Sequence, residues 1–116
     1  VVSGIQQQIK RLANSGAQHI LLFNLPNLGK TPFAYAYQVN QQLENLSLQH
    51  NDKIQQAFKD LSHEYPNTQW LFLDVQQFFN EILQNPKPYG FNNVVDACID
   101  LNDNRLAQST HPAMLT

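Results

Sequence analysis

Histidine is the side chain best suited to proton transfer near neutral pH, and this chain contains four histidines. His19, His50 and His63 lack the His-x-x-x-His and His-Glu-x-x-His spacings of metal ligands, and no cysteine cluster accompanies them. We therefore predict neither a metal site nor a cofactor. We interpret His50 as a histidine at the edge of the core, because it falls on the apolar stripe of a predicted helix.

Asp74 and Cys98 are two further side chains with reactive chemistry. Asp74 ends a predicted strand and could act as an acid, but Gln77 three residues later completes a helix cap, and we favour the cap. Cys98 has no base at a fixed spacing, so we do not predict it to be a nucleophile. As the single cysteine it is compatible either with a reducing compartment or with a disulfide partner outside this chain.

The first elements predicted along the chain are a helix and a strand. Ser3 and Gln6 have the spacing of a capping box, apolar residues then recur along one helix face, and Gly16 is a stop signal. The strand covers Ala17–Asn24, where four apolar residues follow one another without alternation. Such a run is typical of a strand that is covered on both faces and parallel to its neighbours.

A long helix, a second strand and a third helix follow. Thr31 and Pro32 predict a helix start with Thr31 as the cap, and an amphipathic pattern continues until Pro66. Residues 70–73 form the second apolar strand, and the apolar spacing after Asp74 predicts another helix. The order is α-β-α-β-α, followed by a turn-rich segment after Asn85.

This order predicts one α/β domain over residues 1–116, with ligands binding where the parallel strands end. Two strands alone make a poor sheet, so we expect the chain to be part of a larger domain. It begins at Val1, without a leader pattern, which we interpret as a processed or excised piece.

Charge and the length of the apolar runs argue against nucleic-acid binding and against a membrane-spanning segment. The net charge of -2 and the pI near 6.0 do not favour nucleic acid, since the seven Lys and Arg residues are scattered. No apolar run approaches the roughly 18 residues needed to span a membrane, so we predict no transmembrane segment.

Several segments, taken in order, resemble the later part of GDSL-type esterases/lipases in the SGNH hydrolase superfamily. The resemblance covers roughly residues 2–99 and rests on the order and spacing of these segments: Gly16–Asn24, Leu25–Gly29 with Thr31-Pro32, Val39–Leu43, Leu73-Asp74-Val75, Tyr89-Gly90-Phe91 and Asp96-Ala97-Cys98.

The resemblance implies a three-layer, flavodoxin-like α/β fold with a parallel sheet, present here as a partial, C-terminal portion of the domain. It implies hydrolysis of carboxylic esters, lipids or small esters, by a serine nucleophile. The family's serine, glycine and Gly-x-Asn-Asp blocks should precede Val1, so we expect this chain alone to be inactive and to need the N-terminal part of the same domain as its partner. The resemblance also points to a bacterial protein that is secreted, periplasmic or at the cell surface.

Thr110-His111-Pro112 resembles the second half of the family's Asp-x-x-His-Pro block, which makes His111 the candidate catalytic base. Gln108 stands where that block has aspartate, and an amide cannot stabilise imidazolium by charge. The alternative for His111 is a solvated terminal histidine.

The resemblance suggests a substrate cleft made by two loops. Asn24, Asn27 and Gly29 either line an acyl pocket or satisfy a tight loop, and Tyr89 and Phe91 either form a cleft wall or anchor their loop to the core. The alternative function is a non-catalytic α/β module that binds a protein partner through the loops Leu25–Pro32 and Tyr89–Phe91.

Overall fold

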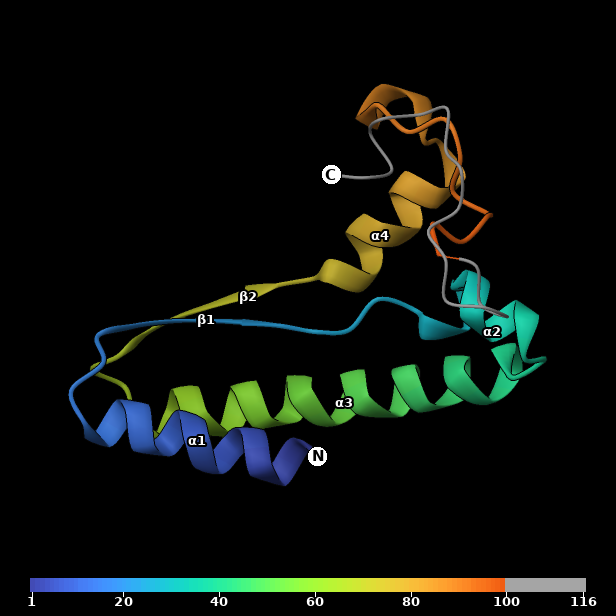
Figure 1. Cartoon of the computed structure of the whole chain (residues 1–116). Helices are drawn as coiled ribbons and strands as arrows, with labels where there is room; N and C mark the ends of the chain where they lie inside the picture. The colour runs from blue at the N-terminus through green and yellow to red at the C-terminus, as the bar shows by residue number, and fades with distance from the viewer. Residues whose placement is uncertain (100–116) are drawn as a thin grey trace.

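The computed structural model of this chain describes residues 1–99. Its four helices and two strands follow the order α1-β1-α2-α3-β2-α4, and two short 3-10 turns, η1 and η2, follow β1 and α4 (Figure 1). The elements are α1 (Val2–Asn14), β1 (His19–Phe23), η1 (Leu28–Lys30), α2 (Pro32–Ala36), α3 (Asn40–Glu64), β2 (Gln69–Leu73), α4 (Val75–Gln84) and η2 (Lys87–Tyr89).

The two strands of the described chain pair in parallel, in a register that runs from His19 opposite Gln69 to Phe23 opposite Leu73. Parallel strands need a long crossover, and α3 supplies it. Both strands therefore end at the same edge of the sheet. The predicted α/β class and parallel pairing are confirmed.

One face of the sheet is packed against α1 and α3, which lie side by side beneath the strands (Figure 1). Ile20 of β1 meets Ile9 of α1 and Leu61 of α3 in the core. Phe58 of α3 extends this layer, with its ring centroid 5.2 Å from that of Phe72. Apolar burial on this side fixes how the helices lie against the strands.

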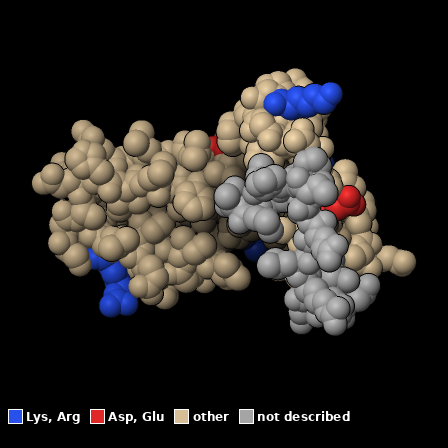
Figure 2. All heavy atoms as spheres, turned by 45° about the horizontal axis from the view of Figure 1, so that its top comes forward, with Lys and Arg blue, Asp and Glu red and all other residues tan. Residues whose placement is uncertain are grey.

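The opposite face of the sheet is open in the described part of the chain. Leu21, Phe23, Leu71 and Leu73 are 50–65% exposed, and Figure 2 shows few charged side chains over the surface that it presents. Of the two faces that the apolar run predicts to be covered, only one is covered within residues 1–99, as expected of part of a larger domain. The unbroken apolar run makes both faces of β1 apolar, but α1 and α3 bury only the face that carries Ile20.

Of the helix ends predicted from capping and stop residues, one start is wrong, and one stop and one cap are correct. The capping box at Ser3 is wrong, because α1 begins at Val2 and Ser3 lies within its first turn. Gly16, with φ of +101°, is the predicted stop, in the left-handed region that glycine favours. Thr31 caps α2 as predicted, since its Oγ1 accepts a hydrogen bond from the Ala34 N–H.

The long helix expected after Thr31 is instead two helices. α2 ends at Ala36, and α3 begins at Asn40 after Gln38, which has φ of +55°. A non-glycine residue in that region breaks the helix, because left-handed backbone cannot continue a right-handed helix. α2 is thereby set off from α3 as a separate short helix beyond the strand ends (Figure 1).

Across residues 1–99, the helices are too short or too polar to cross a bilayer.

Candidate functional site

The chain leaves β1 at Asn24 and β2 at Asp74, and these two side chains meet at the edge of the sheet where ligands bind in open α/β folds. Asn24 Nδ2 donates to Asp74 Oδ1 at 2.9 Å, and Asn24 Oδ1 accepts from the Gln76 N–H at 3.0 Å. Asn24 is only 6% exposed. It therefore ties the end of one strand to the helix that follows the other.

Asp74 is an ionised helix cap. Its Oδ1 accepts from the Gln77 N–H at 3.0 Å, as the cap prediction required. The amide of Asn24, and then the Gln77 N–H, hold the pKa of Asp74 below its ordinary value, because both donate to the charged carboxylate. These contacts give Asp74 a structural position at the strand ends.

Asn51 of α3 clamps the backbone of Leu25, the residue after Asn24. Its Oδ1 accepts from the Leu25 N–H at 2.8 Å, and its Nδ2 donates to the Leu25 carbonyl at 2.9 Å. Nδ2 also donates to Gln76 Oε1 at 3.2 Å. One buried amide therefore replaces the ladder partners that β1 loses where it ends.

Asn27 and Ser47 hold the rest of the loop. Asn27 Oδ1 accepts from the Gly29 N–H at 2.9 Å, and its Nδ2 donates to Glu44 Oε1 at 3.2 Å. Ser47 Oγ accepts from the Leu28 N–H at 3.1 Å. Leu25, Asn27, Leu28 and Gly29 thus each have a hydrogen-bond partner from α3 or from the loop itself.

Gly29 lies directly against the start of α3. A Cβ added there would overlap the Asn40 carbonyl oxygen and would lie 2.9 Å from the backbone N and the Cβ of Glu44. Only glycine allows this approach of loop to helix.

The structure therefore brings together Asn24, Asn27 and Gly29 of the predicted cleft in one buried loop. Their observed contacts are those of the tight-loop alternative, and contact with a substrate stays a prediction. Sequence reasoning missed Ser47 and Asn51. The signal was present, because both fall on the same helical stripe as Ile54, Ala57 and Leu61.

The second predicted wall, Tyr89 and Phe91, is about two-fifths exposed. The Tyr89 ring stands perpendicular to that of Phe78 of α4, with centroids 5.7 Å apart, which fits the anchoring alternative. Residues 24–30, here called the strand-end loop, are joined to α4 because Lys30 Nζ donates to Asn80 Oδ1 at 3.3 Å. Residues 89–91 and the strand-end loop are thus linked through α4, without direct contact being established between them.

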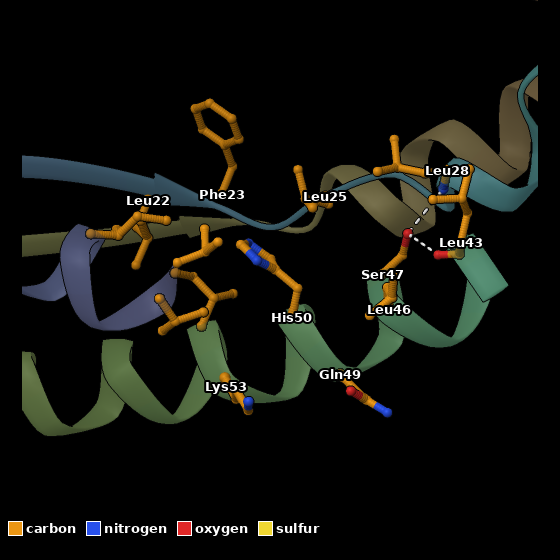
Figure 3. Close-up of a pocket in the computed structure, with 14 residues that line it drawn as sticks. Leu22, Phe23, Leu25, Leu28, Leu43, Leu46, Ser47, Gln49, His50 and Lys53 are labelled. Atoms are coloured by element: carbon orange, nitrogen blue, oxygen red, sulfur yellow. Dashed lines mark hydrogen bonds between the residues drawn. The ribbon is translucent and has the colours of Figure 1, made fainter. Parts of the chain in front are cut away.

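An apolar cavity of about 710 Å³ opens between β1, the start of α1 and the first half of α3. His50 points into it between Leu22 and Leu25 (Figure 3). Burial, followed by the positive charge of the chain's amino terminus, lowers the pKa of His50 below 6.5. The prediction that His50 lies at the core edge is consistent with this half-buried position.

His111 and Gln108 lie outside the described residues. Cys98 is half-buried. Within residues 1–99 no group of three or more His, Cys, Asp or Glu side chains could hold a metal ion.

Comparison with known proteins gives several curated relatives, among them GDSL esterases/lipases and an acyltransferase. The chain is 30% identical over 98 residues to a phosphatidylcholine-sterol acyltransferase of Aeromonas hydrophila, a match that covers 84% of this chain and 28% of that protein. It is 27% identical over 113 residues to a GDSL esterase/lipase of Arabidopsis thaliana, covering 94% of this chain and 31% of the relative. A second GDSL esterase/lipase of that plant is 29% identical over 104 residues, covering 84% and 30%. The chain thus spans about three tenths of the length of these curated relatives, and no protein-family model matches it.

Proposed function

We propose that this chain, a relative of the GDSL esterases/lipases, supplies part of an α/β domain that hydrolyses carboxylic esters of lipids or small molecules. The observation that carries the proposal is the sequence similarity, which extends over 94% and 84% of the chain in two relatives that share the GDSL esterase/lipase description. The parallel strands and their ordered ends are compatible with the SGNH hydrolase fold that these relatives imply.

In this proposal the chemistry is divided between this chain and the rest of the domain. A serine outside residues 1–116 attacks the ester carbonyl, and donors that accompany it stabilise the oxyanion. His111 takes the serine proton and returns it to the leaving alcohol. Because Gln108 cannot supply a carboxylate, another acid must orient His111 or its imidazolium is stabilised less.

The strand-end loop contributes shape to the cleft. We assign the acyl group to a position next to this loop, whose backbone is fixed. The side chains of Asn24 and Asn27 hold it by hydrogen bonds, and Gly29, which has no side chain, lets it pack directly against α3. Tyr89 and Phe91 supply exposed rings for a cleft wall.

The N-terminal part of the same domain is the partner that we assign to the open face of the sheet. Four large apolar side chains there are half-exposed or more, and a parallel sheet is ordinarily covered on both faces. The apolar cavity beside β1 offers a second contact area for it. By analogy with the family we place the protein outside the cytoplasm, secreted or periplasmic.

Hydrolysis of p-nitrophenyl esters tests the proposal. We expect the longer gene product to be active, this chain alone to be inactive, and a His111→Ala variant of the longer protein to lose about a thousandfold or more in kcat. His63→Ala, on the exposed last turn of α3, is the matched control and should keep full turnover. Unchanged turnover in His111→Ala removes His111 from the mechanism, and a longer protein without esterase activity removes the function.

The alternative of a protein-binding module receives less support. Between Leu25 and Pro32 only Lys30 is exposed, so this loop presents little surface to a partner. A hydrolase can use a buried loop as a fixed edge of its substrate cleft, whereas a loop that binds a protein partner must be accessible.

A further inference from the structure

One edge of β1 is open in the described part of the chain. The Gln69 N–H donates to the Gln18 carbonyl at 2.7 Å, and the pairing continues in register along both strands. Because the backbone groups of successive residues in a strand face opposite edges, the even-numbered residues of β1 face β2. Residues 1–99 supply no strand at the other edge of β1, which the backbone N–H and carbonyl groups of three residues face: His19, Leu21 and Phe23.

Unpaired backbone groups along an extended strand suit one kind of cover. They need alternating donors and acceptors at the spacing of a strand, which another extended backbone supplies and an apolar surface does not. Leu25, the next residue of this alternation, already has both partners, because Asn51 bonds its N–H at 2.8 Å and its carbonyl at 2.9 Å. Residues 17–25 contain no charged residue or proline, which commonly protect a natural sheet edge. This edge of β1 is therefore suited to receive a strand that ends before Leu25.

The helices beneath the sheet indicate on which side of β1 a preceding strand lies. α1 leads into β1 as α3 leads into β2, because both helices lie beneath the strands and run opposite to them (Figure 1). Connections between parallel strands of one sheet are almost always right-handed. Two right-handed connections whose helices cover the same face step across the sheet in the same direction. A strand joined to β1 through α1 thus lies on the side of β1 away from β2.

The apolar cavity is the second observation that favours this side. It is lined by Leu22 and Phe23 of β1, by the start of α1 and by the first half of α3, but by no residue of β2. The cavity therefore opens on the β1 side of the helix layer. A strand paired with β1 would lie over it, and apolar side chains that point inward from that strand would fill it.

We propose that an extended segment of the N-terminal part of the domain pairs in parallel with β1 along residues 19–23, which makes β1 an interior strand. The proposal deepens the proposed function and rests on it for the existence of that part of the domain. Because parallel strands end at the same edge of a sheet, the loop after the added strand lies beside the strand-end loop. That loop then supplies the groups that complete the cleft next to Asn24 and Leu25.

Residue-resolved amide exchange in the longer gene product, followed by NMR, tests this pairing. We expect the amides of Leu21 and Phe23 to be protected at least about a hundredfold more than those of Trp70 and Phe72, which face the outer edge of β2. Protection at Leu21 and Phe23 that does not exceed that at Trp70 and Phe72 overturns the proposal, as does a gene that encodes no longer protein. Equal protection in this chain alone also overturns it and assigns the edge to a second copy.

Leu21→Pro and Leu21→Ala form a matched pair of variants, because both remove the side chain but only proline removes the N–H. That N–H faces away from β2, so proline leaves the ladder between β1 and β2 in place. In the longer protein we expect Leu21→Pro to lower the protection of the Phe23 amide about tenfold or more, and Leu21→Ala less than about threefold.

The Leu71 amide, which faces β1, reports whether the sheet of the proline variant is intact. If Phe23 and Leu71 both stay protected in Leu21→Pro, the pairing is refuted. If both lose protection, the variant has unfolded, and the comparison of the two edges in the wild type decides. Exchange is measured without hydrolysis, so a longer protein with a protected β1 edge but no esterase activity refutes only the proposed function. An active esterase without that protection refutes only the pairing.

Discussion

Replacing Asn51 with alanine tests whether one buried amide holds the strand-end loop. The substitution removes the partners of the Leu25 N–H and carbonyl, at 2.8 and 2.9 Å, and the donor to Gln76. Each backbone hydrogen bond contributes about 0.5–1.5 kcal/mol, and a buried group left without a partner costs about 1–3 kcal/mol. We expect the free energy of unfolding to fall by about 2–3 kcal/mol.

The matched control is Asn45→Ala, on the exposed side of the same helix. Both substitutions gain about 0.6 kcal/mol of helix propensity, so the difference between them isolates the contacts of Asn51. Urea unfolding followed by far-ultraviolet circular dichroism gives both free energies. If the two variants differ by less than about 0.5 kcal/mol, the clamp on Leu25 does not stabilise the loop and the reasoning is refuted.

Three further predictions concern packing and pH. Gly29→Ala should lower the free energy of unfolding by about 2 kcal/mol or more, because the added Cβ has no room. Gly4→Ala is the control: no atom lies near its added Cβ, so it should raise the free energy of unfolding by about 0.5–1 kcal/mol in the same urea assay. The lowered pKa of His50 means that the unfolded chain takes up a proton before the folded chain as pH falls. The stability that is present above pH 6.5 should therefore be lost between pH 6.5 and the pKa of the folded state. Urea midpoints measured across that window should fall less in His50→Gln than in the wild type, and an equal fall contradicts the assignment. Ile20→Ala should cost about 2–4 kcal/mol, but Leu21→Ala on the open face of the same strand less than about 1 kcal/mol, and equal costs would mean that the second face is covered.

Features that depend on neighbouring residues could be predicted from the sequence. The caps at Thr31 and Asp74 need only a side-chain oxygen and a backbone N–H three residues on, and both caps are present. The two strands follow from short apolar runs bounded by polar residues, and their parallel pairing follows from the helix between them. These parts of the fold are local in origin.

Features that depend on residues distant in sequence could not be predicted. The break at Gln38 arises because α2 is held to the strand-end loop while α3 runs under the sheet, and no residue near it is a glycine or proline stop signal. Asn51 is an ordinary polar helix residue until the end of β1 lies beside it. What covers the second face of the sheet could not be predicted for a related reason, because an apolar side chain shows that a face can be buried and not which segment buries it.

The hydrogen bond between Asn24 and Asp74 joins residues fifty positions apart, and the same separation runs through the whole strand register. Closing so long a loop has an entropic cost that no local contact offsets, so strand pairing should come late in folding and limit its rate. α3 lies within that loop and gains its backbone hydrogen bonds from near neighbours, so it can form early and shorten the distance to be closed. The helix that later anchors the loop at Asn51 is therefore also the element that makes the meeting of the two strands kinetically accessible.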